Sequence, residues 1–199
     1  MIAKSFNLCY DFINTIRKGA DRPMDLFAAQ LIPGADRHAA AYALLRYAVQ
    51  RTRGIPCPEI ARTPGGKPYF IGTSVPYFSL SHTKTHVLAA LSEHEIGADI
   101  ETRRRIDDRL RDRLFTPEEQ REFDFFDGWT LREAIFKLTG AGGLMTMRLA
   151  RTASGISTPF PDVRCRSYDD IPGCAVAVAC REDSFPDKIE IVAPTLFFT

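Results

Sequence analysis

The first clear pattern along the chain is a helical spacing of apolar residues. Between residues 36 and 53 alanine and leucine are frequent, and apolar positions recur at Ala40, Leu44, Leu45 and Val49. Gly54 and Pro56 follow, as they do just past the end of a helix. We therefore predict a helix over residues 36–53, followed by the turn-rich segment 62–68.

Three stretches of strand-like sequence come next. They cover residues 77–81, 87–91 and 96–101. The polar residues 92–95 separate the last two stretches, and their length and polarity predict a hairpin turn.

The middle of the chain is charged and predicts helices. Thr116 offers a hydroxyl cap, Pro117 suits the first helical position, and Glu119 stands three residues after the cap, which is the pattern of a capping box. A further helix is predicted from about residue 130 to 139, where Gly140 ends it.

The C-terminal third returns to predicted strands, near residues 163–167, 174–179 and 189–192. Segments 87–100 and 174–191 share a pattern of strand, acidic turn and strand. This echo predicts an α+β fold made of two similar halves, about residues 1–100 and 101–199, with a cleft between them. Since no linker rich in Pro, Ser or Gly separates the halves, we expect one unit over residues 1–199.

Composition narrows the classes of protein. The net charge of +1 over 199 residues argues against a general nucleic-acid binder. No run approaches the roughly 18 apolar residues of a membrane helix, and residues 1–10 do not resemble a signal peptide. The 5 cysteines have irregular spacing and no C-x-x-C pair, which favours reduced thiols and a cytoplasmic protein.

Two acidic residues lie within the predicted strand 96–101. Side chains alternate along a strand, so Asp99 and Glu101 share one face while Ala98 and Ile100 point into the core. Two carboxylates on one face repel each other unless solvent screens them or a cation lies between them. Taken alone, the pair fits a solvated strand edge or a magnesium site.

Glu133 and Lys137 are one turn apart on the predicted helix 130–139 and face the same side. Taken alone, this spacing is typical of a surface ion pair.

Together these motifs resemble the 4′-phosphopantetheinyl transferases. The family's G-[IV]-D-x-E strand matches residues 97–101, and its W-x-x-K-E-[AS]-x-x-K helix matches residues 129–137. Upstream, residues 66–68 are similar to its G-K-P, residues 78–82 to its F-N-x-S-H, and Asp36, Arg37 and Arg46 to the helix that opens the coenzyme site. The matches stand in the family's order between about residues 36 and 140. The chain length resembles the monomeric surfactin-synthetase type, a fused pseudo-dimer with its active site in the cleft between the halves.

The resemblance implies an activity: transfer of phosphopantetheine from coenzyme A to a serine of an apo acyl or peptidyl carrier protein, with release of 3′,5′-ADP. It implies that Mg²⁺ is held by Asp99, Glu101 and Glu133. Glu133, or a water on the metal that it contacts, would be the base, and Lys137 would stabilise or protonate the leaving phosphate oxygen. The implied coenzyme-binding residues are Arg37, Arg46, Lys67, Ser81 and His82.

The chain departs from the family pattern at three positions. Ala98 replaces Ile or Val, for which we expect local repacking. Ser79 stands where many members have Asn. Arg132 replaces Lys, which keeps the charge of a phosphate or surface contact and changes its geometry.

Two further interpretations concern partners and rival activities. Residues 103–105 with Arg109, Arg111 and Arg113 form a basic run, which fits either a solvated face or a docking surface for an acidic carrier protein. The alternative functions are a non-catalytic homologue that binds coenzyme A or a carrier protein, and a magnesium-dependent pyrophosphohydrolase of coenzyme A.

Overall fold

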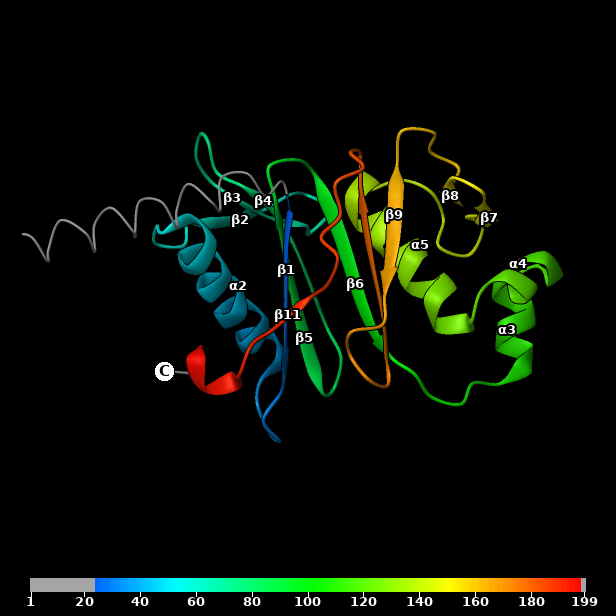
Figure 1. Ribbon diagram of the computed structural model, residues 1–199, viewed down its shortest axis with the longest axis horizontal. Coiled ribbons are helices and arrows are strands. Elements are labelled where there is room, and N and C mark those ends of the chain that lie inside the picture. Colours follow the sequence, from blue (N-terminus) through cyan, green and yellow to red (C-terminus); the bar gives the residue numbers. More distant parts are fainter. Residues whose placement is uncertain (1–23, 198–199) are drawn as a thin grey trace, which may run out of the picture.

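The computed structural model describes residues 24–197, and its helices and strands form layers (Figure 1). Helix α2 (Arg37–Arg53) covers one sheet, helix α5 (Phe125–Thr139) covers the other, and the two sheets pack face to face. The mixture of helices and strands confirms the predicted α+β class. Cys9 and residues 1–10, which the signal-peptide argument used, lie outside the described residues.

The first sheet has the strand order β11-β1-β5-β4. Its strands are β1 (Met24–Gln30), β4 (Tyr77–His82), β5 (His86–Ser92) and the short β11 (Glu190–Ile191). β5 is antiparallel to both of its neighbours, and β11 runs parallel to β1.

The second sheet has the order β6-β10-β9, with every pair antiparallel. Its strands are β6 (Ile96–Thr102), β9 (Arg164–Tyr168) and β10 (Cys174–Cys180). Two small hairpins complete the strands: β2 (Ile60–Arg62) with β3 (Pro68–Phe70), and β7 (Ala150–Thr152) with β8 (Gly155–Ser157). A 3₁₀ turn covers Pro194–Leu196.

Helix α2 begins and ends where the sequence predicts. The Asp36 side chain caps it by accepting bonds from the backbone N–H groups of His38 and Ala39. Gly54 ends it with a φ of 66°, the left-handed conformation that glycine adopts without strain.

The predicted capping box is confirmed in α4 (Pro117–Glu122), which follows α3 (Asp108–Leu114). Thr116 accepts from the backbone N–H of Glu119, and the Glu119 carboxylate accepts from the backbone N–H of Thr116. Helix α5 ends at Gly140 as predicted but begins at Phe125, about five residues earlier than expected, because Asp124 caps it.

The predicted hairpin over residues 92–95 is wrong. Both edges of β5 are occupied by β1 and β4, so β6 pairs with β10 in the second sheet instead. Apolar residues on the inner faces explain this crossover: Leu88 and Ala90 of β5 pack in one core with Ala98 and Ile100 of β6. The short polar link therefore carries the chain from one sheet to the other.

Two expectations from composition concern the cysteines and membrane-spanning helices. The four described cysteines are free thiols: Cys57, Cys165, Cys174 and Cys180. Among residues 24–197, no helix is both long and apolar enough to cross a bilayer.

Candidate active site

Strand β6 presents its carboxylates to α5 through simple alternation. Ala98 and Ile100 are buried in the core between the sheets. Asp99 lies on the opposite face and is only 5% exposed, and Glu101 shares that face, half-buried. The predicted facing of these side chains is confirmed.

Gly97 allows α5 to lie directly against this face of β6. A Cβ atom added at Gly97 would stand 2.0 Å from the Ala134 carbonyl oxygen and 2.6 Å from the Leu138 backbone nitrogen. Both contacts are far inside van der Waals range, so any larger residue would push the helix away. The glycine of the motif thus sets the distance between the strand and the helix that carries Glu133 and Lys137.

Lys137 reaches from α5 to the middle of β6. Its Nζ atom lies 2.6 Å from Asp99 Oδ1 and donates to the Ala98 carbonyl oxygen at 3.1 Å. Ser81 of β4 donates to the same Asp99 oxygen at 2.7 Å. Among the described residues nothing bonds the other oxygen, Oδ2, although it is buried. Asp99 is therefore held by one oxygen while the second is left available.

The three carboxylates act on one another electrostatically. Burial raises the pKa of Glu133, the negative charge of Asp99 raises it further, and the charge of Lys137 opposes this. Burial likewise raises the pKa of Glu101, with Asp99 adding to the rise and Arg104 and Lys137 opposing it. The site thus concentrates the negative charge of three carboxylates, which Lys137 and Arg104 compensate only in part.

The residues are chemically suited to a hard divalent cation. Carboxylate oxygens are the ligands that Mg²⁺ prefers, and the buried Asp99 Oδ2 has lone pairs that no hydrogen bond uses. As the side chains of residues 24–197 are placed, no three His, Cys, Asp or Glu groups stand close enough together to hold a metal. The donor set fits the ion, and the Lys137 ammonium now neutralises Asp99.

A second cluster, of basic residues, lies where α2 begins. His82, at the end of β4, stacks edge-on against His38 with ring centroids 4.8 Å apart. Burial lowers the pKa of His82, and the positive charges of His38, Arg37 and Lys137 lower it further. The positive potential that acts on His82 here favours an anion such as phosphate.

The remaining predicted coenzyme residues are placed differently. Lys67 extends to the C-terminal end of α5, where its Nζ donates to the Leu138 carbonyl oxygen at 3.5 Å, and burial lowers its pKa. Arg46 is exposed nine residues after Arg37 on α2, which puts the two on opposite sides of the helix, roughly 13 Å apart along its axis. Arg46 instead lies near Cys57: burial raises the pKa of the Cys57 thiol, and the positive charge of Arg46 opposes that rise.

His38 is a residue that sequence reasoning missed. It stands two residues after Asp36, where the predicted helix begins, so its place in the first helical turn could have been inferred. Its contact with His82 could not, because that contact joins α2 to β4 across the fold.

Arg132 does not reach the site or the surface. Its side chain is 0% exposed and pairs with Glu119 at 2.7 Å, and it also donates to the Leu114 carbonyl oxygen at 2.6 Å. Its guanidinium lies over the Phe115 ring at 4.1 Å. Glu119 in turn accepts from the backbone N–H of Leu149, so the pair ties α4 and the loop after α5 to α5 itself. Arg132 is therefore a buried partner of Glu119 and is not placed to contact a phosphate or the surface.

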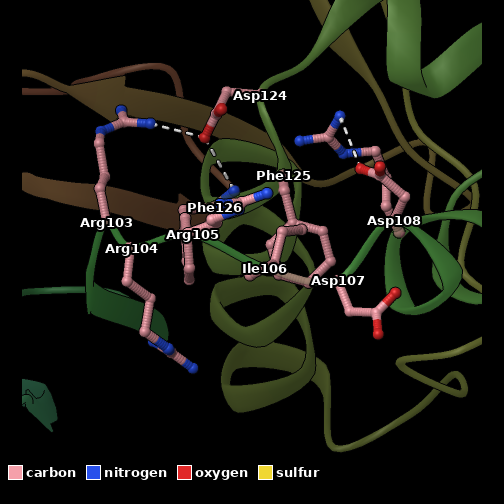
Figure 2. Close-up of a pocket in the computed structure, with 10 residues that line it drawn as sticks. Arg103, Arg104, Arg105, Ile106, Asp107, Asp108, Asp124, Phe125 and Phe126 are labelled. Carbon is pink, nitrogen blue, oxygen red and sulfur yellow. Dashed lines mark hydrogen bonds and ion pairs between the residues drawn. The ribbon is translucent and has the colours of Figure 1, made fainter.

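The basic run after β6 lines a cavity of about 680 Å³ beside the start of α5 (Figure 2). The cavity is less basic than the run suggests, since four arginines and three aspartates line it. Arg103 is engaged by Asp124 at 2.8 Å and Asp127 at 2.5 Å. Figure 2 shows Phe125 and Ile106 between Arg104 on one side and Asp107 and Asp108 on the other. Glu101 and Glu133 are not among the residues that line this cavity.

Comparison with known proteins gives consistent matches. The family model described as the 4′-phosphopantetheinyl transferase superfamily matches residues 95–166, which contain both β6 and α5. The chain is 30% identical over 169 residues to 4′-phosphopantetheinyl transferase psf-1 of Bacillus pumilus, covering 75% of this chain and 72% of that protein. It is 35% identical over 121 residues to 4′-phosphopantetheinyl transferase AcpT of Escherichia coli O157:H7, covering 54% of this chain and 60% of that one. It is also 24% identical over 147 residues to 4′-phosphopantetheinyl transferase ffp of Bacillus subtilis, covering 64% and 65%.

Proposed function

The chain belongs to the 4′-phosphopantetheinyl transferase superfamily, and from this premise we propose that it transfers phosphopantetheine from coenzyme A to a serine hydroxyl of an apo carrier protein. The observation that carries the proposal is the junction of β6 and α5. There Asp99, Glu101 and Glu133 act on one another, and Lys137 lies 2.6 Å from Asp99.

Glu133 is suited to receive the serine proton. A serine hydroxyl is a poor nucleophile at neutral pH, so a base must take its proton as the oxygen attacks phosphorus. Burial and the charge of Asp99 raise the pKa of Glu133, which makes its carboxylate a stronger base than an exposed glutamate. The serine oxygen bonds to the phosphorus next to the pantetheine arm, and the bond from that phosphorus to the bridging oxygen breaks. 3′,5′-ADP then leaves with the electron pair.

Lys137 supplies fixed positive charge for that departure. Its ammonium is anchored by the Ala98 carbonyl oxygen and Asp99, so it needs no reorganisation when charge develops on the leaving phosphate. Its third acceptor is the Leu80 carbonyl oxygen at the long distance of 3.5 Å, so one weakly bonded proton remains to stabilise or protonate the leaving oxygen.

Asp99, Glu101 and Glu133 are the residues that would hold Mg²⁺, with the unbonded Asp99 Oδ2 as the first ligand. When bound, the ion neutralises charge on the pyrophosphate and orients it.

The basic cluster would receive the phosphates of coenzyme A. Arg37 acts electrostatically on His82, whose ring contacts His38, so one guanidinium and two imidazoles lie together here. Lys67 is half-buried near α5 and would add a point charge. Coenzyme binding by Arg46 stays a prediction, and the position of Arg46 on the other side of α2 does not support it.

We propose that the chain is built of two related halves, because β1-β5-β4 and β6-β10-β9 repeat one strand order and one set of antiparallel pairings. Between its first and second members along the chain, the first set has α2 and the hairpin β2-β3, and the second has α3, α4 and α5 and the hairpin β7-β8. This order supports a boundary at residues 93–95, slightly before the predicted one near residue 100. The site at β4, β6 and α5 would then lie where the halves meet. A cytoplasmic location remains our proposal, supported by the free cysteines among the described residues, and a monomer stays a prediction from the family resemblance.

The arginine-lined cavity is proposed as the docking surface for the carrier protein. Within the described chain, Arg105 and Arg109 are exposed and take part in no ion pair, unlike Arg103, so their charges are available to an acidic partner. Arg105→Glu should raise the KM for the carrier roughly fivefold, the effect of about 1 kcal/mol, and added salt should shrink the difference. Arg51→Glu reverses an equally exposed arginine on α2 and should leave that KM unchanged. Equal effects of the two reversals would contradict docking at this cavity.

The proposed activity is tested by weighing carriers. The full chain is incubated with coenzyme A, Mg²⁺ and a panel of apo carrier proteins, and the carriers are analysed by intact mass spectrometry beside Glu133→Ala and chelated samples. A gain of one phosphopantetheine that both controls abolish supports the transferase. No gain on any carrier, with coenzyme A still bound, would favour a non-catalytic binder, and coenzyme A cleaved without a carrier would favour a pyrophosphohydrolase.

A further inference from the structure

Strands β4 and β6 are the edge strands at which the two sheets meet. Each pairs through its backbone on one side only, β4 with β5 and β6 with β10. The free edges are connected by side chains, and two serines of β4 provide the connections: Ser79 and Ser81. We call this pair the serine clasp.

Ser79 takes the place of a strand partner for Ala98. Its hydroxyl oxygen accepts from the Ala98 backbone N–H at 2.9 Å and lies 3.5 Å from the Ala98 carbonyl oxygen. Both residues are buried, so the Ala98 N–H would otherwise lack water as well as a strand partner, whereas the carbonyl oxygen also accepts from Lys137. The hydroxyl thereby fixes the peptide that precedes Asp99.

Ser81 lies two residues further along β4, on the same face as Ser79, and reaches the carboxylate itself. Its hydroxyl donates to Asp99 Oδ1 at 2.7 Å, and Lys137 donates to the same oxygen at 2.6 Å. Two donors on one oxygen fix the rotation of the carboxylate and leave the buried Oδ2 as the unbonded oxygen.

We propose that Ser81 is a positioning residue for Asp99, and that the serine clasp aligns this carboxylate for the divalent cation. The inference rests on the proposed function, in which Asp99 is a metal ligand. It gives Ser81 a role distinct from coenzyme binding, because a hydroxyl has one proton to donate. While that proton is shared with Asp99, none is left for a phosphate oxygen, which only accepts.

Metal binding is measured directly with Mn²⁺ as the probe. Free Mn²⁺ is followed by electron paramagnetic resonance during titration of the full chain with coenzyme A present, against a blank of coenzyme A alone. Residues that orient metal ligands typically change metal affinity 10–100-fold, and we expect Ser81→Ala to weaken Mn²⁺ binding at least tenfold. Ser81→Thr keeps the hydroxyl and should restore most of the affinity, and Ser79→Ala should weaken it less than Ser81→Ala.

Two further variants separate positioning from other effects. Ser92→Ala removes another buried serine hydroxyl, in β5, whose bond within residues 24–197 is to the nearby backbone N–H of His94, so it should leave Mn²⁺ binding unchanged. His82→Ala should weaken metal-free coenzyme A binding, measured by calorimetry, whereas Ser81→Ala should not.

The inference is overturned if Ser81→Ala behaves like His82→Ala, with weaker coenzyme A binding and unchanged Mn²⁺ affinity. It is also overturned if wild type binds no Mn²⁺ beyond the blank, whereas the transferase proposal is decided separately by the mass of the carriers. Weaker Mn²⁺ binding in Ser81→Ala that Ser81→Thr restores supports it.

Discussion

The β1-β5-β4 sheet with α2 and the β6-β10-β9 sheet with α5 share a strand order, but only the second gathers carboxylates around a lysine of its helix. The first meets α2 mainly through an apolar core, with one ion pair at the start of β1, Asp25 with Arg53 at 3.0 Å. In the first sheet Met24 pairs with Ser92 and Gln30 with His86, and in the second Ile96 pairs with Cys180 and Thr102 with Cys174. By this register, Phe27 and Ala29 hold the positions of Asp99 and Glu101. Both are buried against α2 in an apolar core.

The comparison shows which contacts a carboxylate site needs in a fold that is otherwise held together by apolar packing. In the first unit, aromatic and aliphatic side chains fill the space between strand and helix. In the second, Gly97 lets the helix approach, and Lys137 and Ser81 bind Asp99. The site therefore depends on a few specific contacts that the apolar unit does not need.

The largest expected effect comes from removing the charge of Glu133. Glu133→Gln should lower the initial rate of carrier modification roughly 10³-fold or more, because it removes the base and one carboxylate oxygen for the metal. Leu45→Ala in α2 is the counterpart in the apolar unit and should cost about 2–5 kcal/mol of stability while the rate per folded molecule is kept. A Glu133→Gln enzyme that retains most of its rate would remove the chemical distinction between the units.

The next effect concerns the helices. The buried side chains of α2 are all apolar, whereas α5 buries Arg132, which pairs with Glu119. Arg132→Ala leaves Glu119 as an uncompensated buried charge and should cost about 3–5 kcal/mol in urea unfolding. Arg121→Ala removes an exposed ion pair with Glu118 and should cost at most about 1 kcal/mol. Similar losses in the two variants would mean that burial of Arg132 contributes little.

A smaller effect is expected where strand and helix touch. Gly97→Ala places its Cβ 2.0 Å from the Ala134 carbonyl oxygen, so α5 must shift. We expect a loss of about 1–3 kcal/mol in stability and about 10² in rate, since a displacement near 1 Å moves Glu133 and Lys137 away from Asp99. Gly65→Ala meets its nearest atom, Thr63 Oγ1, at 3.8 Å and should be neutral in both measurements. An active Gly97→Ala enzyme would show that the close approach is not needed.

Local patterns in the sequence predicted the parts of the site that depend on local geometry. The direction of the Asp99 side chain follows from strand alternation. The cap at Thr116 follows from the local pattern of Thr116, Pro117 and Glu119. The crossover between β5 and β6 could not be predicted, because a short polar link serves a hairpin and a change of sheet equally well. The early start of α5 could not be predicted because Gly128 disfavours a helix. The structure needs glycine there, since a Cβ atom at residue 128 would stand 2.5 Å from the Phe115 ring.

Burial of Arg132 was equally out of reach of sequence reasoning. Arginine is rarely buried, and its partner Glu119 is 13 residues away, too far for any helical spacing rule. The contact of His38 with His82 is of the same kind, since it joins segments that only the tertiary fold brings together. What sequence reasoning missed are therefore contacts between distant elements.

The smallest effect is the pH dependence that Glu133 gives to the stability of the carboxylate unit. The pKa of Glu133 is raised above its ordinary 4.5 by burial and by Asp99, so the folded state binds this proton more tightly than the unfolded state. Stability is then lost as pH rises from about 4.5 through the raised pKa, and Glu133→Gln removes that loss.

Thermal unfolding should show Glu133→Gln more stable than wild type at pH 8, by about 2 °C or less because the group is partly exposed, and equal to it at pH 4. Ala29→Gly, a change in the apolar unit, should lower stability equally at both pH values. A Glu133→Gln protein that is less stable than wild type at pH 8 would mean that the carboxylate is stabilised by its surroundings, and the electrostatic contrast between the two units would be wrong.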